Sequence, residues 1–300
     1  MVASDPCFIV NPASGSIKDP DELCATIRAV FPNAGIRLGT APGDAERQAA
    51  EALSQGWKTI VAAGGDGTLN ETLNGVATGL ADIRLGLLPL GTGNDFSRVI
   101  DVPLDVNAAL QIIASGRTRD IDLIRVTSSR TRLLINVSAG GFSGQVDEKL
   151  TEEVKAAWGP LSYVRGFVEA LSDLSEYQTE IVLDDDERIQ LSAYNVVVAN
   201  GRYVARGVPI APTAEIDDGL ADLVVVRTAS AGTLALLTPQ MLVGAHLDND
   251  EILFRRARKI VINSEPCMRF NTDGEFVGDE PAIFEVMPRA LRMIVGSAAA

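Results

Sequence analysis

A glycine-rich turn that holds a single carboxylate, residues 64–68 (Gly-Gly-Asp-Gly-Thr), follows a mostly apolar run at 58–63. Where a strand ends in such a turn and a helix begins, backbone N–H groups point outward with no Cβ atoms in the way, and such a site binds phosphate. The carboxylate of Asp66 would repel a bare phosphate. Its presence indicates a nucleotide whose phosphates are bridged by a divalent cation.

The same turn has a purely structural interpretation, a capping box in which Thr68 and Glu71 cap the helix that follows. Capping does not require three glycines within four positions. We therefore favour phosphate binding, and the two interpretations are compatible.

Two further polar turns follow apolar runs, at residues 11–15 (Asn-Pro-Ala-Ser-Gly) and 91–95 (Gly-Thr-Gly-Asn-Asp). Each turn alone is a weak signal. In an open parallel sheet, however, ligands bind beyond the carboxyl ends of the strands. Three such turns at one sheet edge predict a composite nucleotide site.

A second pair of carboxylates lies at residues 273–275 (Asp-Gly-Glu). Transfer of a phosphoryl group to an alcohol needs a base that accepts the hydroxyl proton, and Glu275 has the required chemistry. Taken from the residues alone, a plain β-turn is the better interpretation, because Asp-Gly is a strong hairpin signal. Asp66 and Asp95 are better candidates for holding a catalytic Mg²⁺ than for the base.

The elements that must position these turns change in type near residue 120. Before it, strand-like runs at 7–10, 36–39, 58–63 and 85–90 alternate with helical patterns such as 20–30 and 43–54, which predicts a parallel sheet covered by helices. After it, short alternating runs separated by turn signals predict a largely antiparallel β domain. Three helical inserts are expected in the second part, at 146–157, 161–174 and 231–243.

Composition excludes several classes of protein. With 26 basic and 40 acidic residues, the net charge is −14, which argues against binding to duplex DNA. Three cysteines without clustered spacing indicate neither a disulfide framework nor a zinc site, and the single histidine, His246, is interpreted as a helix C-terminal residue. The longest apolar segment, 233–247, is too short to span a bilayer, so a soluble cytoplasmic protein is expected.

The glycine turns, taken together with more distal segments, resemble the diacylglycerol kinase catalytic-domain family, including the soluble bacterial lipid kinases. The Gly-Gly-Asp-Gly-Thr turn alone is shared with NAD kinases and phosphofructokinases. The lipid kinase branch typically combines two segments that both occur here, Gly-Thr-Gly-Asn-Asp-Phe at 91–96 and the distal Asp-Gly-Glu at 273–275. The matching segments are 11–15, 64–71, 88–96, 136–142, 158–160, 200–201, 210–212, 217–219 and 273–275.

This resemblance implies a fold of the α/β plus β class. The implied N-terminal domain, residues 1–122, is a three-layer α/β nucleotide-binding kinase domain, and a last strand at about 289–300 returns to it. The implied C-terminal domain, residues 123–288, is a mainly antiparallel β-sandwich with helical inserts that binds the lipid substrate. The active site is expected in the cleft between the domains.

The resemblance also assigns roles to single residues. It makes Glu275 the proton acceptor, and it implies a structural magnesium site formed by backbone oxygens of Glu215 and Leu220 and the carboxylate of Asp218. Most of the predicted nucleotide contacts come from the resemblance, and the glycine turns themselves add Gly64, Gly93 and Asn94. The full set is Asn11, Pro12, Ala13, Ser14, Gly15, Thr40, Gly64, Gly65, Asp66, Gly67, Thr68, Leu69, Asn70, Glu71, Thr92, Gly93 and Asn94.

The expected function is an ATP-dependent lipid kinase that uses Mg²⁺ and phosphorylates a lipid hydroxyl, such as that of diacylglycerol. The alternatives are an NAD kinase-like enzyme and a catalytically silent nucleotide- or lipid-binding regulator. The lipid would be presented by the inner face of a membrane. Contact between the protein and that surface would be transient, because net acidity argues against tight binding to an anionic bilayer. No nucleic-acid partner is expected, and the sequence leaves open which lipid is used and whether two copies form a homodimer.

Overall fold

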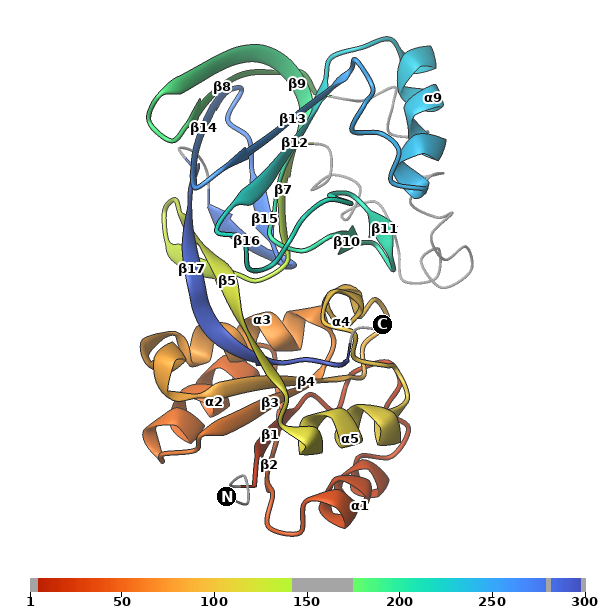
Figure 1. Cartoon of the computed structure of the whole chain (residues 1–300), viewed down its shortest axis with the longest axis vertical. Coiled ribbons are helices and arrows are strands. Elements are labelled where there is room, and N and C mark those ends of the chain that lie inside the picture. Colours follow the sequence, from red (N-terminus) through yellow and green to blue (C-terminus); the bar gives the residue numbers. More distant parts are fainter. Residues whose placement is uncertain (1–4, 142–174, 279–281, 298–300) are drawn as a thin grey trace. The chain divides into compact units, whose positions relative to one another are not determined.

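The computed structural model describes residues 5–141, 175–278 and 282–297, and the statements below refer to these ranges. The chain forms two compact units, residues 1–122 with 289–300, and residues 123–288. The first has a parallel sheet covered by helices and the second is an antiparallel β-sandwich (Figure 1). The predicted fold class is confirmed.

The first unit is built on a parallel sheet with strand order β4-β3-β1-β2, and the end of β17 pairs in parallel with β4. β1 and β3 are buried along their whole length, as their apolar sequences require. The strands are β1 (Cys7–Val10), β2 (Gly35–Leu38), β3 (Thr59–Gly64), β4 (Arg84–Pro89) and β17 (Ala282–Ile294).

Helices cover both faces of this sheet. α2 packs against α3 on one face, and α1 packs against α5 on the other, which gives the three expected layers (Figure 1). α1 begins with Pro20, a residue suited to the first position of a helix, and is capped by Asp19, whose carboxylate accepts the N–H of Asp21 at 2.9 Å. The helices are α1 (Pro20–Val30), α2 (Asp44–Ser54), α3 (Asp66–Gly75), the 3₁₀ helix η1 (Ala77–Asp82), α4 (Asp95–Val99) and α5 (Val106–Ser115).

The strands of the second unit pair mainly antiparallel with one another. Its main path runs β16-β15-β7-β9-β8-β14-β17, with β12 paired to β9 and β13, and β5 paired to β6 and β17. The elements are β5 (Thr118–Thr127), β6 (Thr131–Leu134), β7 (Val137–Gly141), β8 (Tyr177–Leu183), β9 (Glu187–Ala199), β10 (Tyr203–Val204), β11 (Val208–Pro209), β12 (Ala221–Arg227), α9 (Ala231–Leu242), β13 (Ile252–Ala257), β14 (Lys259–Glu265), β15 (Phe270–Thr272) and β16 (Glu275–Gly278).

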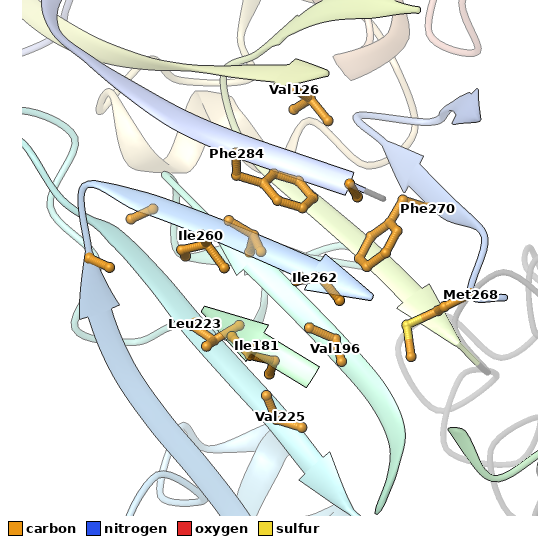
Figure 2. Close-up of a cluster of buried hydrophobic side chains, with 14 of the residues drawn as sticks. Val126, Ile181, Val196, Leu223, Val225, Ile260, Ile262, Met268, Phe270 and Phe284 are labelled. Carbon is orange, nitrogen blue, oxygen red and sulfur yellow. The ribbon is translucent and has the colours of Figure 1, made fainter. Parts of the chain in front are cut away.

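Two hydrophobic clusters lie on opposite sides of β9 and β12. Leu223 and Val225 face one cluster, shown in Figure 2, where Phe270 and Phe284 meet edge to face at 5.5 Å. Val224 and Val226 face the other, which α9 helps to close. Strands that are buried on both faces read as continuous apolar runs, which explains why β12 does not alternate in polarity.

Two of the predicted helical inserts, 146–157 and 161–174, lie outside the described residues. The third is confirmed as α9. His246 is not part of that helix, because α9 ends at Leu242 and His246 lies buried in the turn beyond it. None of the helices in the described ranges has the length and apolar character needed to cross a bilayer.

Candidate active site

The β3–α3 turn leaves the start of α3 without a side-chain cap. Gly65 is the N-cap residue and has extended backbone angles, and no side chain caps the helix. The alternative capping box is therefore wrong. The Thr68 hydroxyl accepts instead from the Asn11 amide at 3.3 Å, and the Glu71 carboxylate accepts the Ala45 N–H of α2 at 3.2 Å. A start of α3 that has no side-chain cap is compatible with the predicted anion site, which stays a prediction.

Asp66 joins the β3–α3 turn to the β4–α4 turn. Its two carboxylate oxygens accept the N–H groups of Asp95 and Phe96, both at 3.0 Å, so that Asp66 caps α4. Asn94 precedes α4 in a left-handed conformation, and its amide group binds both the N–H and the carbonyl of Gly91. Asn94 therefore shapes its own turn, and Asp66 supplies the helix cap.

The three glycine turns adjoin one another at glycine positions. A Cβ atom on Gly91 would lie 2.4 Å from the Cα of Gly65, so these two backbones touch and no side chain fits between them. A Cβ atom on Gly15 would lie 2.9 Å from the Thr92 hydroxyl. The structure thus brings together the turns at 11–15, 64–68 and 91–95, as the composite site requires.

The carboxylates of Asp66 and Asp95 both flank Gly93. A Cβ atom added there would lie 3.2 Å from an Asp66 oxygen and 3.4 Å from an Asp95 oxygen. Gly93 thus leaves space between two carboxylates, next to the uncapped N-terminus of α3. Such an arrangement fits a Mg²⁺ ion that is bound together with nucleotide phosphates. The role of the two aspartates stays a prediction, and the geometry is compatible with it.

Other predicted nucleotide residues lie at the same sheet edge or inside the unit. Thr40 follows β2, where its N–H and its hydroxyl both donate to Asp44 at 2.7 Å; these bonds and Arg47 hold the pKa of Asp44 well below its usual range. Leu69 and Asn70 are buried on α3. Their side chains point away from solvent, and their assignment stays a prediction.

The Asp273-Gly274 pair forms the turn of the β15–β16 hairpin, with positive φ angles of 47° and 91°. The sequence-based turn interpretation is confirmed. Asp273 also anchors this hairpin to the neighbouring chain, because its carboxylate accepts the N–H groups of Ile135 at 2.9 Å and Val137 at 3.0 Å. The first carboxylate of the Asp-Gly-Glu segment is thus engaged in backbone contacts.

Glu275 begins β16 and is oriented by arginines from the β5–β6 hairpin. Its Oε2 atom accepts from Arg132 Nη2 at 2.7 Å and Nε at 3.2 Å, and Arg130 Nη2 lies 3.9 Å away. Within the described part of the chain, Oε1 has no hydrogen-bond partner. Sequence reasoning missed both arginines, because an Arg-Thr-Arg segment at the start of a short strand carries no distinctive signal.

The one carboxylate of the predicted structural magnesium site, that of Asp218, is engaged by other groups of the chain. The Oδ1 atom of Asp218 accepts the Leu220 N–H at 3.0 Å, and its Oδ2 atom forms an ion pair with Arg256. Both carboxylate oxygens are therefore occupied. In the ranges that the structure describes, no group of three or more Asp, Glu, His or Cys side chains could hold a cation.

Comparisons with known proteins decide the family. The model of the diacylglycerol kinase catalytic domain matches residues 5–126, and that of the YegS C-terminal NAD kinase beta sandwich-like domain matches residues 136–295. A "Diacylglycerol kinase" of Staphylococcus saprophyticus is 33% identical over 282 residues, which cover 92% of this chain and 90% of that relative. The chain belongs to the diacylglycerol kinase family. The resemblance expected from the motifs is confirmed.

Further relatives and solved structures match most of the chain. A "Diacylglycerol kinase" of Staphylococcus aureus is 31% identical and covers 92% of this chain and 88% of its own. A solved structure from Bacillus anthracis has a TM-score of 0.84 and 25% identity, over 99% of this chain and 96% of that one. A second, titled as one of the diacylglycerol kinases of that organism, has a TM-score of 0.76 and 24% identity, with 97% of each chain covered, and shows the fold alone.

Proposed function

We propose that this protein is an ATP-dependent lipid kinase that transfers the γ-phosphoryl group to the hydroxyl of a lipid acceptor such as diacylglycerol. The observation that carries the proposal is Asp66, which joins two glycine turns and lies with Asp95 against Gly93. This arrangement suits a metal-bridged triphosphate, and it occurs in a chain of the diacylglycerol kinase family.

The nucleotide half of the site acts by positioning and charge. The uncapped amides of α3 bind phosphate oxygens, and the close Gly65–Gly91 contact keeps side chains away from them. Mg²⁺ bound with ATP would neutralise the charge that the phosphates carry. Asp66 and Asp95 would hold that ion, and the α4 cap fixes Asp66 in place.

The proton acceptor of the proposal is Glu275. As the lipid oxygen forms its bond to the γ-phosphorus, the bond from that phosphorus to the ADP oxygen breaks and the hydroxyl proton passes to a carboxylate. Glu275 suits this role because Arg132 fixes Oε2, whereas Oε1 has no partner in the described ranges and is available to the proton. Asp273 does not suit it, because backbone amides occupy its oxygens.

The acceptor lipid would be reached by transient contact with a membrane. The net charge of −14 opposes lasting attachment to an anionic bilayer at physiological salt. We therefore propose a cytoplasmic enzyme that visits the inner membrane face during turnover.

The test is transfer of label from γ-labelled ATP in the presence of Mg²⁺, with a mixed lipid extract and with NAD as parallel acceptors. We expect label in the lipid fraction, and mass spectrometry of the product identifies the lipid. Label on NAD alone would replace the proposal by an NAD kinase-like activity. A folded protein that transfers label to neither acceptor would favour the silent regulator.

Glu275→Gln tests the base within the same assay. We expect turnover to fall by about 10²–10⁴-fold, since a general base contributes that much. Calorimetric affinity for Mg·ATP should remain within about twofold, because the substitution lies outside the glycine turns. Full turnover by a folded variant would assign the base to another group.

A further inference from the structure

A buried carboxylate lies near the start of β12 in the second unit. Asp222 is on β12, between β9 and β13, and is 1% exposed. A carboxylate removed from water in this way needs a cationic or hydrogen-bonding partner, because an unpaired buried charge is strongly destabilising. The partner of Asp222 therefore matters for the stability of the sheet.

That partner is Arg256, and the backbone register places it there. Asp222 and Arg256 are directly opposite in the antiparallel β12–β13 pair. Arg256 Nε donates to Asp222 Oδ1 at 3.0 Å, and its Nη2 atom forms an ion pair with Asp218. One guanidinium therefore bridges two carboxylates, one in the strand and one in the turn that leads into it.

The remaining acceptors of the two carboxylates are also occupied. Asp222 Oδ2 accepts from the Thr213 hydroxyl at 3.1 Å, and Asp218 Oδ1 accepts the Leu220 N–H at 3.0 Å. A second guanidinium, that of Arg202, donates to the Ala214 carbonyl at 2.7 Å, next to Glu215. The segment 213–222 is thus held by two cationic side chains of the chain itself.

We propose that the guanidinium of Arg256 takes the place of a structural metal ion at this turn, so that the second unit holds its 213–222 segment without metal. The planar fork of an arginine can donate to two carboxylates at once, which a bound cation would otherwise bridge. A divalent ion would have to displace the guanidinium from Asp218. This inference does not depend on the proposed kinase activity.

The first test uses the wild-type chain without nucleotide. We expect dialysed protein to contain no stoichiometric Mg²⁺, Ca²⁺ or Zn²⁺ by elemental analysis. We also expect its unfolding temperature to change by less than about 1 °C when EDTA is added. Stoichiometric metal, or a loss of several degrees in EDTA that Mg²⁺ restores, would overturn the proposal.

The second test removes the guanidinium. Arg256→Met leaves two neighbouring carboxylates without their cation, and we expect its unfolding temperature to fall by at least about 4 °C. Added Mg²⁺ or Ca²⁺ should then recover part of this loss. A variant as stable as the wild type, or one whose loss is unaffected by either cation, would count against Arg256 as the replacement.

Arg255→Met is the matched control, because Arg255 is adjacent on β13 but pairs with the exposed Glu187 at 3.1 Å. Its unfolding temperature should stay within about 1 °C of the wild type. Any effect of Mg²⁺ at the glycine turns would appear equally in this control. If Arg256→Met does not fold, Arg256→Lys replaces it, because lysine keeps the charge but not the planar fork. Its unfolding temperature should fall by less, and Mg²⁺ or Ca²⁺ should restore part of that fall. A lysine variant with neither the fall nor the recovery would overturn the proposal.

Discussion

Arg132 shows how one residue can determine what a neighbouring carboxylate is able to do. It is mostly buried, with 14% of its side chain exposed, and it contacts Glu275 through two donors to a single oxygen. This leaves the second oxygen of the proposed base in a fixed position. Orientation of a base within hydrogen-bond reach of its proton is a large part of general base catalysis.

We expect Arg132→Met to lower the turnover number by at least about tenfold while the KM for ATP changes by less than about twofold, since the turns of the first unit are unaffected. Arg132→Lys should recover part of the loss. Steady-state kinetics against the lipid acceptor measures both. Arg125→Met is the control, because Arg125 pairs at 4.0 Å with the exposed Glu285. Wild-type turnover in Arg132→Met would show that Glu275 needs no arginine.

Asp66 combines a structural and a chemical role, and two substitutions separate them. Asp66→Asn keeps an oxygen that can cap α4 but loses the negative charge, whereas Asp66→Ala loses both. We expect each to weaken Mg·ATP binding by at least about tenfold, or about 1.4 kcal/mol. Asp66→Ala should lower the unfolding temperature more than Asp66→Asn, because asparagine keeps one of the two acceptors for the N–H groups of α4. Calorimetry with ATP in the presence and absence of Mg²⁺ makes the comparison, and unchanged Mg·ATP affinity in Asp66→Asn would remove the metal role.

Among the elements, the turn that follows α9 contains the only histidine of the chain. His246 is fully buried, and its Nε2 atom donates to the Ile210 carbonyl at 2.9 Å, which leaves Nδ1 without a hydrogen and without a partner in the described ranges. Burial lowers the pKa of His246 from its ordinary value of 6.5. Folding therefore favours the neutral imidazole.

This arrangement makes stability depend on pH in one direction. Below about pH 6.5 the unfolded chain gains a proton that the folded chain does not bind, so folding stability falls as the pH falls towards the lowered pKa of the folded state. We expect His246→Gln, which retains a donor for Ile210, to reduce this slope by up to about 1.4 kcal/mol per pH unit. Urea unfolding at several pH values between 5.5 and 7.5 measures it. Equal slopes in the two proteins would exclude His246 as the source.

Local patterns were sufficient to predict most elements of the first unit. The structure contains the strand–glycine turn–helix units, and α1 begins at Asp19-Pro20. Both features depend only on residues that are neighbours in the sequence. Contacts between distant residues could not be predicted this way. The cap that Asp66 provides for α4 spans about 30 positions, and the Arg132–Glu275 pair spans 143. Both depend on tertiary packing, which a local pattern does not encode.

At the scale of the whole molecule, the acidic charge is distributed so that it neutralises the basic segment of β13 and β14. Arg255 pairs with Glu187, Arg256 with Asp218 and Asp222, and Lys259 with Asp185. The basic stretch that the sequence shows at 255–259 is therefore largely engaged within the second unit. These ion pairs are typical of the polar side of two strands rather than of a surface dedicated to anionic lipid.

The first unit contains residues that are far apart in the chain. Arg292 and Met293 of β17 pair with Arg84 and Leu85 of β4, and the N–H of Gly296 donates to the Ile100 carbonyl at 2.9 Å. During translation, residues 1–122 are synthesised well before residues 289–296. One side of β4 in the nascent first unit therefore stays unpaired while the second unit is synthesised. The part of the protein that is synthesised first is therefore the part that is completed last.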